Sequence, residues 1–274
     1  MIPPASPDTA SAMASSAGQL KRGFRQLTTS RASWLLVAIL IAFQVSPIIW
    51  SLITPTEKST ALAQTQMLMG LKRCEFFSGS FWQPLSHALI HGNWLHLFLN
   101  GAAILLLGSK LEHIIARRSY WLLCLFSTLA GALMFLLFTP YGNPQPSEPA
   151  QQILVGSSAI CFAFLVCLTT LSPDSKFLPV FLSGKTVGVA IILMTLILAL
   201  LNPELPTGPL AKLGNYPTEN GFPNLFKVSH ACHFGGALTG WLYGRYLLRP
   251  RVTIESLRRA REKTERLAQA ANQR

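Results

Sequence analysis

The chain has 274 residues, half of them hydrophobic, and only 12% of them carry a charge. A soluble domain of this length would carry about twice that share of charged side chains, so the composition excludes an ordinary soluble fold. The net charge of +12 could suggest nucleic-acid binding, but the basic residues lie between apolar blocks in a pattern that membrane topology explains.

Six apolar blocks follow one another along the chain, each close to the about 20 residues that a helix needs to cross a bilayer. They cover residues 33–53, 94–111, 120–138, 153–171, 186–201 and 228–248. Pro47 is expected to kink the first of them. The sequence therefore predicts an all-α fold, a polytopic bundle of six transmembrane helices that forms a core over residues 32–248.

The segments outside these spans differ from them in composition. Residues 1–31 are rich in Ser, Ala and Pro and become basic at their end, which is typical of a disordered tail. The long loop of residues 54–93 is aromatic and amphipathic, which favours a place in the membrane interface. Residues 249–274 are typical of a basic helix that is solvated or rests on anionic lipid.

The basic residues predict the orientation in the membrane. With a cytoplasmic N-terminus, only five of the 23 Lys and Arg residues lie on the outer side, namely Lys58, Lys72, Arg73, Lys212 and Lys227. The positive-inside rule then places both termini in the cytoplasm. We expect a multi-pass protein of a bacterial inner (plasma) membrane, whose surroundings are the lipid bilayer, and we expect no nucleic-acid partner. The sequence predicts no oligomeric state.

Polar side chains stand at the head of three of the spans. Such residues are costly in lipid, so they mark a function or a buried network. His96 and Asn100 are four residues apart, which places them on one face of a helix. Asn100, Ser158 and His233 each lie about five or six residues inside the outer end of their predicted spans. The three side chains are therefore expected at a similar depth.

Small residues give a reason for two of these spans to touch. The sixth span has Gly236, Gly240 and Gly244, and the fourth region has Gly156, Ala159 and Ala163. Such spacing lets helix backbones approach closely in lipid. His233 would then come within reach of Ser158, and a serine beside a histidine base is an activated nucleophile. No Asp or Glu lies in the outer half of any predicted span, so the pattern predicts a Ser–His dyad.

These motifs resemble those of the rhomboid intramembrane serine proteases over about residues 33–248. The matching residues, in chain order, are His87, His91, His96, Asn100, Gly156, Ser158, His233, Gly236 and Gly240. The resemblance implies that Ser158 is the nucleophile and that His233 is the general base. It implies that His96, Asn100 and the backbone N–H of Ser158 stabilise the oxyanion. The remaining matching residues, His91, Gly156, Gly236 and Gly240 among them, would be structural.

The resemblance also carries expectations about the reaction. Substrates would be membrane proteins whose transmembrane segment is cleaved near the outer face, with no metal and no cofactor. Glu112 resembles a structural glutamate that follows the second span, and Trp82 resembles the tryptophan of a Trp-Arg pair. The chain departs from the family at Ala159, which is usually glycine, at Gln83, which is commonly arginine, and at Phe162, which is often tyrosine.

Two other classes of protein stay open. One is a catalytically inactive rhomboid-like protein that binds client transmembrane helices, which Ala159 and Gln83 favour weakly and the retained Ser158 and His233 oppose. The other is a metal or proton transporter that uses the histidines, namely His87, His91, His96, His230 and His233. Transporters usually place carboxylates at mid-membrane depth, and none is predicted there. Four of the five cysteines lie in apolar runs, where they are expected to be small apolar side chains.

Overall fold

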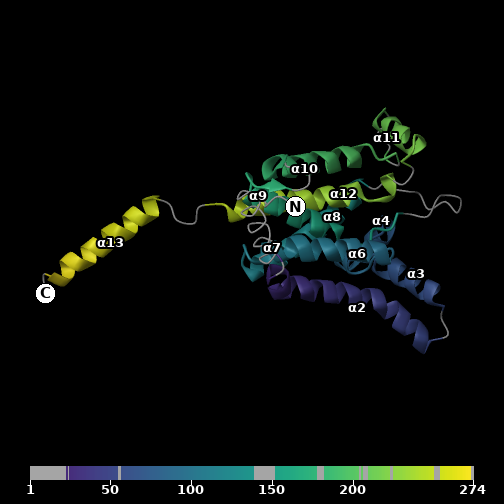
Figure 1. Cartoon of the computed structure of the whole chain (residues 1–274), viewed down its shortest axis with the longest axis horizontal. Coiled ribbons are helices and arrows are strands. Elements are labelled where there is room, and N and C mark those ends of the chain that lie inside the picture. Colours follow the sequence, from purple (N-terminus) through teal and green to yellow (C-terminus); the bar gives the residue numbers. More distant parts are fainter. Residues whose placement is uncertain are drawn as a thin grey trace, which may run out of the picture.

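The computed structural model describes residues 23, 25–54, 57–138, 152–177, 182–203, 205, 209–222, 225–249 and 254–272. Almost all regular structure in these ranges is helical, as the sequence predicted (Figure 1). The exception is a two-residue antiparallel pair, β1 (Lys176–Phe177) and β2 (Leu182–Ser183), which directly precedes α10 (Gly184–Leu200).

The longer helices correspond to the apolar blocks of the sequence. They are α2 (Arg31–Ile53), α6 (Trp94–Ala103) with its continuation η2 (Ile104–Gly108) and α7 (Ser109–Glu112), α8 (Arg117–Phe138), α9 (Ser158–Leu171), α10 and α12 (His230–Leu247). The loop before α6 holds α3 (Lys58–Met69), α4 (Arg73–Phe77), α5 (Gln83–Ser86) and η1 (His87–Leu89). α11 (Pro209–Glu219) and η3 (Leu225–Lys227) lie between α10 and α12, and α13 (Ile254–Asn272) ends the described chain.

Three helical units in the described residues are long and apolar enough to cross a membrane by length and composition: α2, the unit Trp94–Glu112, and α8. α9 and α10 are apolar but shorter. α12 has 18 residues, and its glycines and histidines make it less apolar than the others. These helices are compatible with six spans, and the count of six stays a prediction. Pro47 lies inside α2, as expected.

The second helical unit changes its winding half-way, because η2 is a stretch of π-helix. Gly108, at the end of η2, packs where a side chain would not fit. A Cβ on it would lie 2.8 Å from the ring of Phe164 and 2.9 Å from the hydroxyl of Tyr120. The π-helix therefore ends at a close crossing between this unit, α8 and α9. The sequence analysis did not predict it.

Glu112, the last residue of α7, joins the ends of three helices. Its carboxylate accepts hydrogen bonds from the backbone N–H groups of Ala32 (2.8 Å) and Ser33 (3.1 Å) at the start of α2. The hydroxyl of Ser33 lies 3.2 Å from the same carboxylate and 3.1 Å from the hydroxyl of Tyr120 on α8. A carboxylate at a helix N-terminus satisfies N–H groups that have no partner within the helix.

α9 and α12 cross so closely that the glycines of α12 touch the backbone of α9. A Cβ on Gly236 would lie 2.2 Å from the carbonyl oxygen of Ala159, and one on Gly240 would lie 2.3 Å from that of Ala163. This is the contact that the four-residue spacing of small residues predicted. It brings the first turns of α9 and α12 side by side.

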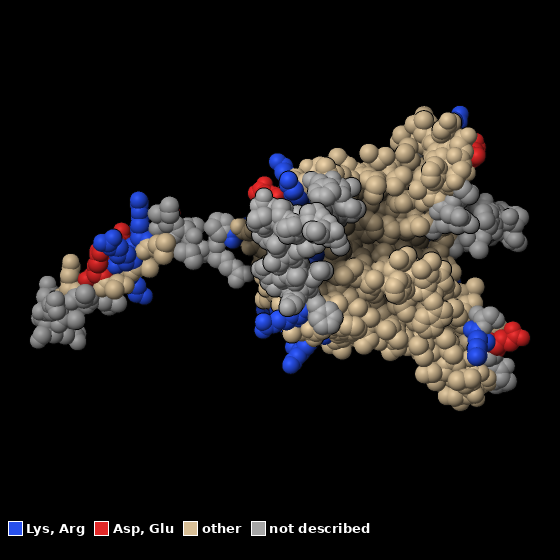
Figure 2. All heavy atoms as spheres, viewed as in Figure 1, with Lys and Arg blue, Asp and Glu red and all other residues tan. Residues whose placement is uncertain are grey.

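Charged residues lie at the two ends of the bundle. Figure 2 shows a broad band free of charge across the middle of the visible face, and α13 stands apart from the bundle with basic and acidic side chains. The predicted disordered tail lies mostly outside the described residues, but residues 25–29 are helical. They are tied to the bundle because Trp34 Nε1 donates to the carbonyl of Leu27 at 2.9 Å and Thr29 Oγ1 lies 3.1 Å from His113 Nε2.

Candidate active site

Ser158 and His233 meet at the crossing of α9 and α12. Ser158 Oγ lies 2.9 Å from His233 Nε2. Ser158 is the first residue of α9, although the sequence analysis placed it about five residues inside a span that began at 153. That boundary was wrong, because residues 152–157 are not helical and Leu154 pairs with Leu71 in an antiparallel bridge. The serine therefore lies at the N-terminus of its helix, where backbone N–H groups have no intrahelical partner.

The ring of His233 is held by other rings. It stacks on Phe162, with a centroid distance of 4.3 Å and an angle of 20° between the planes. The edge of His230 faces it at 6.0 Å, and His230 Nε2 lies 2.7 Å from the carbonyl oxygen of Leu225. Phe162 thus fills the stacking position that is often tyrosine in the family. No acidic partner of His233 occurs among the described residues, so packing fixes its orientation.

Gly156 forms the turn that positions Ser158. Its φ of +107° is a conformation that L side chains rarely adopt. A Cβ on it would also lie 2.6 Å from His96 Cε1, 2.8 Å from His96 Nε2 and 3.4 Å from Asn100 Nδ2. The two predicted oxyanion residues therefore lie directly against the backbone two residues before Ser158, and only glycine leaves room for them.

The side-chain amide of Asn100 carries an unused donor. Its Nδ2 is buried and has no hydrogen-bond partner in the described part of the chain. The oxygens of Asn100 do have a neighbour, because Cys161 Sγ lies 3.6 Å from its backbone carbonyl oxygen and 3.8 Å from its side-chain Oδ1. An unpaired buried N–H is costly. It is the kind of donor that an oxyanion hole keeps for charge that develops during a reaction.

His91 and His87 support the segment before Ser158. The backbone N–H of Ser157 donates to His91 Nε2 at 3.4 Å, and the Ser157 hydroxyl lies 3.2 Å from the same nitrogen. The N–H of Gly156 donates to the carbonyl oxygen of His87 at 2.8 Å. Burial lowers the pKa of His91 to about 3 and that of His87 to about 4, so both rings are neutral at neutral pH. They serve as hydrogen-bonding supports.

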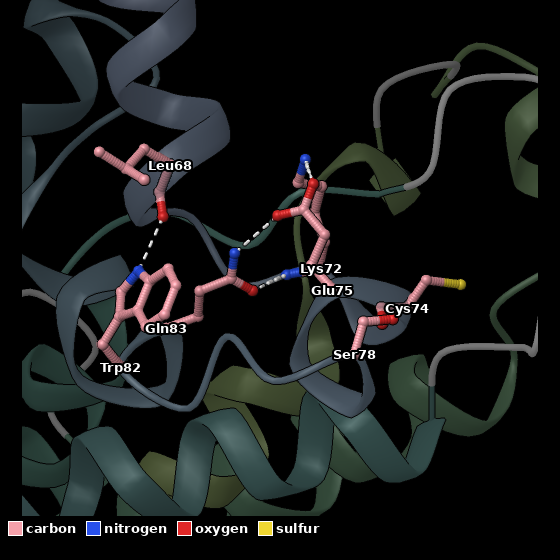
Figure 3. Close-up of polar contacts among 7 residues, drawn as sticks. All are labelled: Leu68, Lys72, Cys74, Glu75, Ser78, Trp82 and Gln83. Carbon is pink, nitrogen blue, oxygen red and sulfur yellow. Dashed lines mark hydrogen bonds and ion pairs between the residues drawn. The ribbon is translucent and has the colours of Figure 1, made fainter.

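Gln83, which stands where the family commonly has arginine, is completely buried at the centre of the first loop (Figure 3). Its Oε1 accepts from the backbone N–H of Lys72 at 3.1 Å, and its Nε2 donates to Glu75 Oε2 at 2.7 Å. Glu75 also pairs with the Lys72 ammonium group. Beside it, Trp82 Nε1 donates to the carbonyl of Leu68 at 3.0 Å. The neutral side-chain amide of Gln83 thus connects α4, α5 and the backbone of Lys72.

This loop network reaches the segment before Ser158 by two routes. Leu71, next to Lys72, exchanges two backbone hydrogen bonds of 2.9 Å with Leu154, two residues before Gly156. The carbonyl oxygen of Gln83 lies 3.1 Å from His87 Nδ1, and the His87 carbonyl in turn accepts from Gly156. The first loop therefore forms a bonded support under the turn that carries Ser158.

Ala159, the second departure from the family pattern, fits its surroundings. It is buried at the crossing of α8, α9 and α12. Gly131 on α8 faces it, and a Cβ on Gly131 would lie 2.8 Å from the Ala159 methyl group. The methyl group that Ala159 adds on α9 is therefore accommodated because Gly131 on α8 has no side chain. Ala159 weakly favoured an inactive protein when only the sequence was considered, because the compensating glycine lies on another helix and no local pattern points to it.

An open cavity of about 810 Å³ leads to the site. Its lining includes Ser158, His233 and His96, together with Asn215 and Thr218 of α11. No Asp, Glu, Lys or Arg is among the described residues that line it. The same described ranges contain no group of three His, Cys, Asp or Glu residues arranged for a metal ion. The participation of α11 was not predicted, because the loop between the fifth and sixth spans carries no motif.

The comparisons with known proteins agree with the motifs. A family model described as the Rhomboid domain matches residues 78–250. A search of curated proteins gives no match. The matched segment is more than half of the chain, and it contains each of the residues on which the resemblance was based, from His87 to Gly240. The chain therefore belongs to the rhomboid family, a family of integral membrane proteins that includes intramembrane serine proteases.

Proposed function

We propose that the protein is an intramembrane serine endopeptidase that cleaves transmembrane substrates near the outer face of the membrane. The observation that carries the proposal is the 2.9 Å contact between Ser158 Oγ and His233 Nε2, beside the unpaired buried amide of Asn100. A serine hydroxyl that faces a histidine nitrogen is set up for nucleophilic attack. A free donor next to it supplies what the resulting oxyanion needs.

In the proposed reaction, Ser158 Oγ attacks the scissile carbonyl carbon while His233 Nε2 takes the serine proton. The oxyanion accepts hydrogen bonds from Asn100, from His96 and from the Ser158 N–H at the start of α9. His233 then gives its proton to the leaving amine, and an acyl-enzyme forms. Water that enters through the open cavity attacks the ester with His233 again as base, which releases the second product and restores the serine.

The remaining parts of the proposal concern the surroundings of the site. Both termini lie in the cytoplasm of a bacterial cell, six spans cross the inner membrane, and the dyad opens toward the outer side. Residues 32–248 form the membrane core, with a basic tail at each end. The substrates are membrane proteins whose helix unwinds near small or helix-destabilising residues. The apolar blocks support these domain limits, the charge distribution supports the orientation, and the family supports the place in a membrane.

The test is covalent labelling of the detergent-solubilised protein by a fluorophosphonate, which reacts with activated serines. Wild-type protein should be labelled, and Ser158→Ala and His233→Ala should each lose the label. Ser46→Ala is the matched control, because Ser46 is exposed on α2 and its hydroxyl donates to the carbonyl of Phe43 in the same helix. It should be labelled like the wild type.

Two results would contradict the proposal. Folded wild-type protein that stays unlabelled, beside an active rhomboid as positive control, would identify an inactive family member that binds client helices. Label that survives Ser158→Ala would mean that another serine reacts, and Ser157 is the neighbour to test. Cleavage itself is then measured with a single-span reporter in liposomes, where Ser158→Ala should abolish the product band.

A further inference from the structure

α11 contributes residues to the cavity that contains Ser158 and His233. It comes between α10 and α12 in the chain and lies beyond the end of α10 (Figure 1). Gly214 rests against the end of α10, where a Cβ on it would lie 1.8 Å from the carbonyl oxygen of Leu201 and 3.3 Å from Pro203. No side chain larger than hydrogen fits there. The position of α11 is therefore set by direct backbone contact with the connection that follows α10.

The two faces of α11 have different surroundings. Asn215 and Thr218, three residues apart and so on one face, line the cavity that also contains Ser158 and His233. Leu213 and Tyr216 are not among the lining residues, and they are 61% and 70% exposed. The helix thus turns a polar, uncharged face toward the dyad and an apolar face away from it.

The chemistry of the cavity is neutral throughout its described lining. The polar groups besides the dyad and His96 are amides and hydroxyls, from Asn93, Gln152, Asn202, Asn215, Thr218 and Ser229. The charged side chains of α11, Lys212 and Glu219, are not among the lining residues. A cavity of this kind disfavours a charged occupant, because a desolvated charge would have no partner of opposite sign.

We propose that α11 is a specificity element that accepts, through Asn215 and Thr218, an uncharged residue of the substrate segment where that segment leaves the membrane. The proposal rests on the proposed function, since it assigns a substrate contact to the same site. α11 follows the end of α10 that lies beside the first turns of α9 and α12. It therefore faces the part of the substrate that extends outward from the scissile bond.

The test uses three peptide diphenyl phosphonates that modify the reactive serine. Each peptide begins with one variable residue, which is Asn, Lys or Asp, and continues with three alanines up to the phosphonate. The rate of serine modification is measured by competition with the fluorophosphonate. The wild type should react faster with the Asn peptide than with either charged peptide. Asn215→Asp should favour the Lys peptide and Asn215→Lys the Asp peptide, and the ratio of the two rates should differ about tenfold between these variants.

The matched controls are Leu213→Asp and Leu213→Lys, which place the same charges on the exposed face of α11. They should leave the order and ratio of the three rates as in the wild type. If the fluorophosphonate labels the protein but the ratio is the same in Asn215→Asp and Asn215→Lys, α11 does not contact the substrate and the inference is wrong. The inference is equally wrong if the Leu213 variants shift the ratio as much. Absence of fluorophosphonate labelling in the wild type contradicts the proposed function instead.

Discussion

The two sides of the cavity are built in different ways. The first-loop wall, residues 71–93, reaches the cavity at Gly92 and Asn93, and buried polar groups hold it behind them, with Gln83, His87 and His91 fully enclosed. The α11 wall, which comprises the described residues of 201–222, is mostly exposed and docks through the backbone contact at Gly214. Segments with few buried contacts open more readily than densely bonded ones. The first-loop wall, which supports the turn before Ser158, is therefore the more rigid of the two, and the α11 wall opens more readily.

Gly156, which the first-loop wall supports through His87, and Gly221, on the α11 wall, give the largest expected contrast. Gly156 and Gly221 have nearly the same φ, +107° and +108°, but a Cβ on Gly156 meets His96, whereas one on Gly221 meets no atom of the described residues within 4 Å. Gly156→Ala should lower the rate of fluorophosphonate labelling about a hundredfold, because it displaces both oxyanion residues. Gly221→Ala carries a similar backbone strain and should be labelled almost normally. Equal losses in both variants would show that strain alone matters.

A polar residue on each wall gives the next contrast. Gln83→Leu removes the partner of the buried Lys72 N–H and leaves the Glu75 carboxylate with the Lys72 ammonium group alone, and it should lower the free energy of unfolding by about 2 kcal/mol. Asn220→Ala removes only an exposed bond to the carbonyl of Tyr216 and should change it by less than about 0.5 kcal/mol. Thermal unfolding in detergent measures both. Equal stability of the two variants would mean that the first-loop wall is not the more rigid one.

The third contrast tests whether Ala159 and Gly131 pack as a matched pair where α8, α9 and α12 cross. Gly131→Ala should destabilise the protein by about 2 kcal/mol, because its methyl group would meet both Ala159 and Cys232 Sγ, at 2.8 and 2.9 Å. Ala159→Gly should cost about 1 kcal/mol, chiefly through helix propensity. The double variant should be more stable than Gly131→Ala alone. Strictly additive losses, measured by the same thermal unfolding, would contradict the matched packing of the two positions.

Acid should loosen only one wall. His87 and His91 have pKa values lowered by burial to about 4 and about 3, from 6.5 in an exposed chain. When residues 83–93 open, His87 and His91 regain an ordinary pKa and bind protons that the buried rings exclude. The folded loop therefore loses stability as the pH falls from about 6.5 toward 4. Hydrogen exchange, corrected for intrinsic rates, should show less protection of residues 83–93 at pH 5 than at pH 7. α11 contains no histidine, and its protection should stay constant.

The sequence was sufficient to predict the helices and the contact between Ser158 and His233 for a physical reason. Long apolar runs have few alternatives in lipid, and the glycine spacing on α12 left α9 as the partner for close packing. The start of α9 was predicted wrongly because Ile153, Leu154 and Val155 are as apolar as the helix that follows. Hydropathy does not distinguish a buried extended segment from a helix. The glycine at 156 was the available signal for a break in the chain.

Other features depend on contacts between distant residues, and no local pattern predicts them. The role of Gln83 requires Lys72 and Glu75 to fold back on it, and the tolerance of Ala159 requires a glycine at position 131 of another helix. The π-helical stretch of η2 and the cavity-facing side of α11 likewise result from tertiary packing. The sequence did contain the departures at these positions, and only the fold explains how they are accommodated.

The carboxylate of Glu112 has a consequence for biosynthesis. It caps the N-terminus of α2 from a position 80 residues further along the chain. When α2 enters the membrane, its first N–H groups therefore have no protein partner until the second helical unit has been synthesised and has crossed back. α2 is then expected to stay loosely placed beside the translocon, and arrival of Glu112 closes the first three helices into a unit before the serine-bearing helix is made.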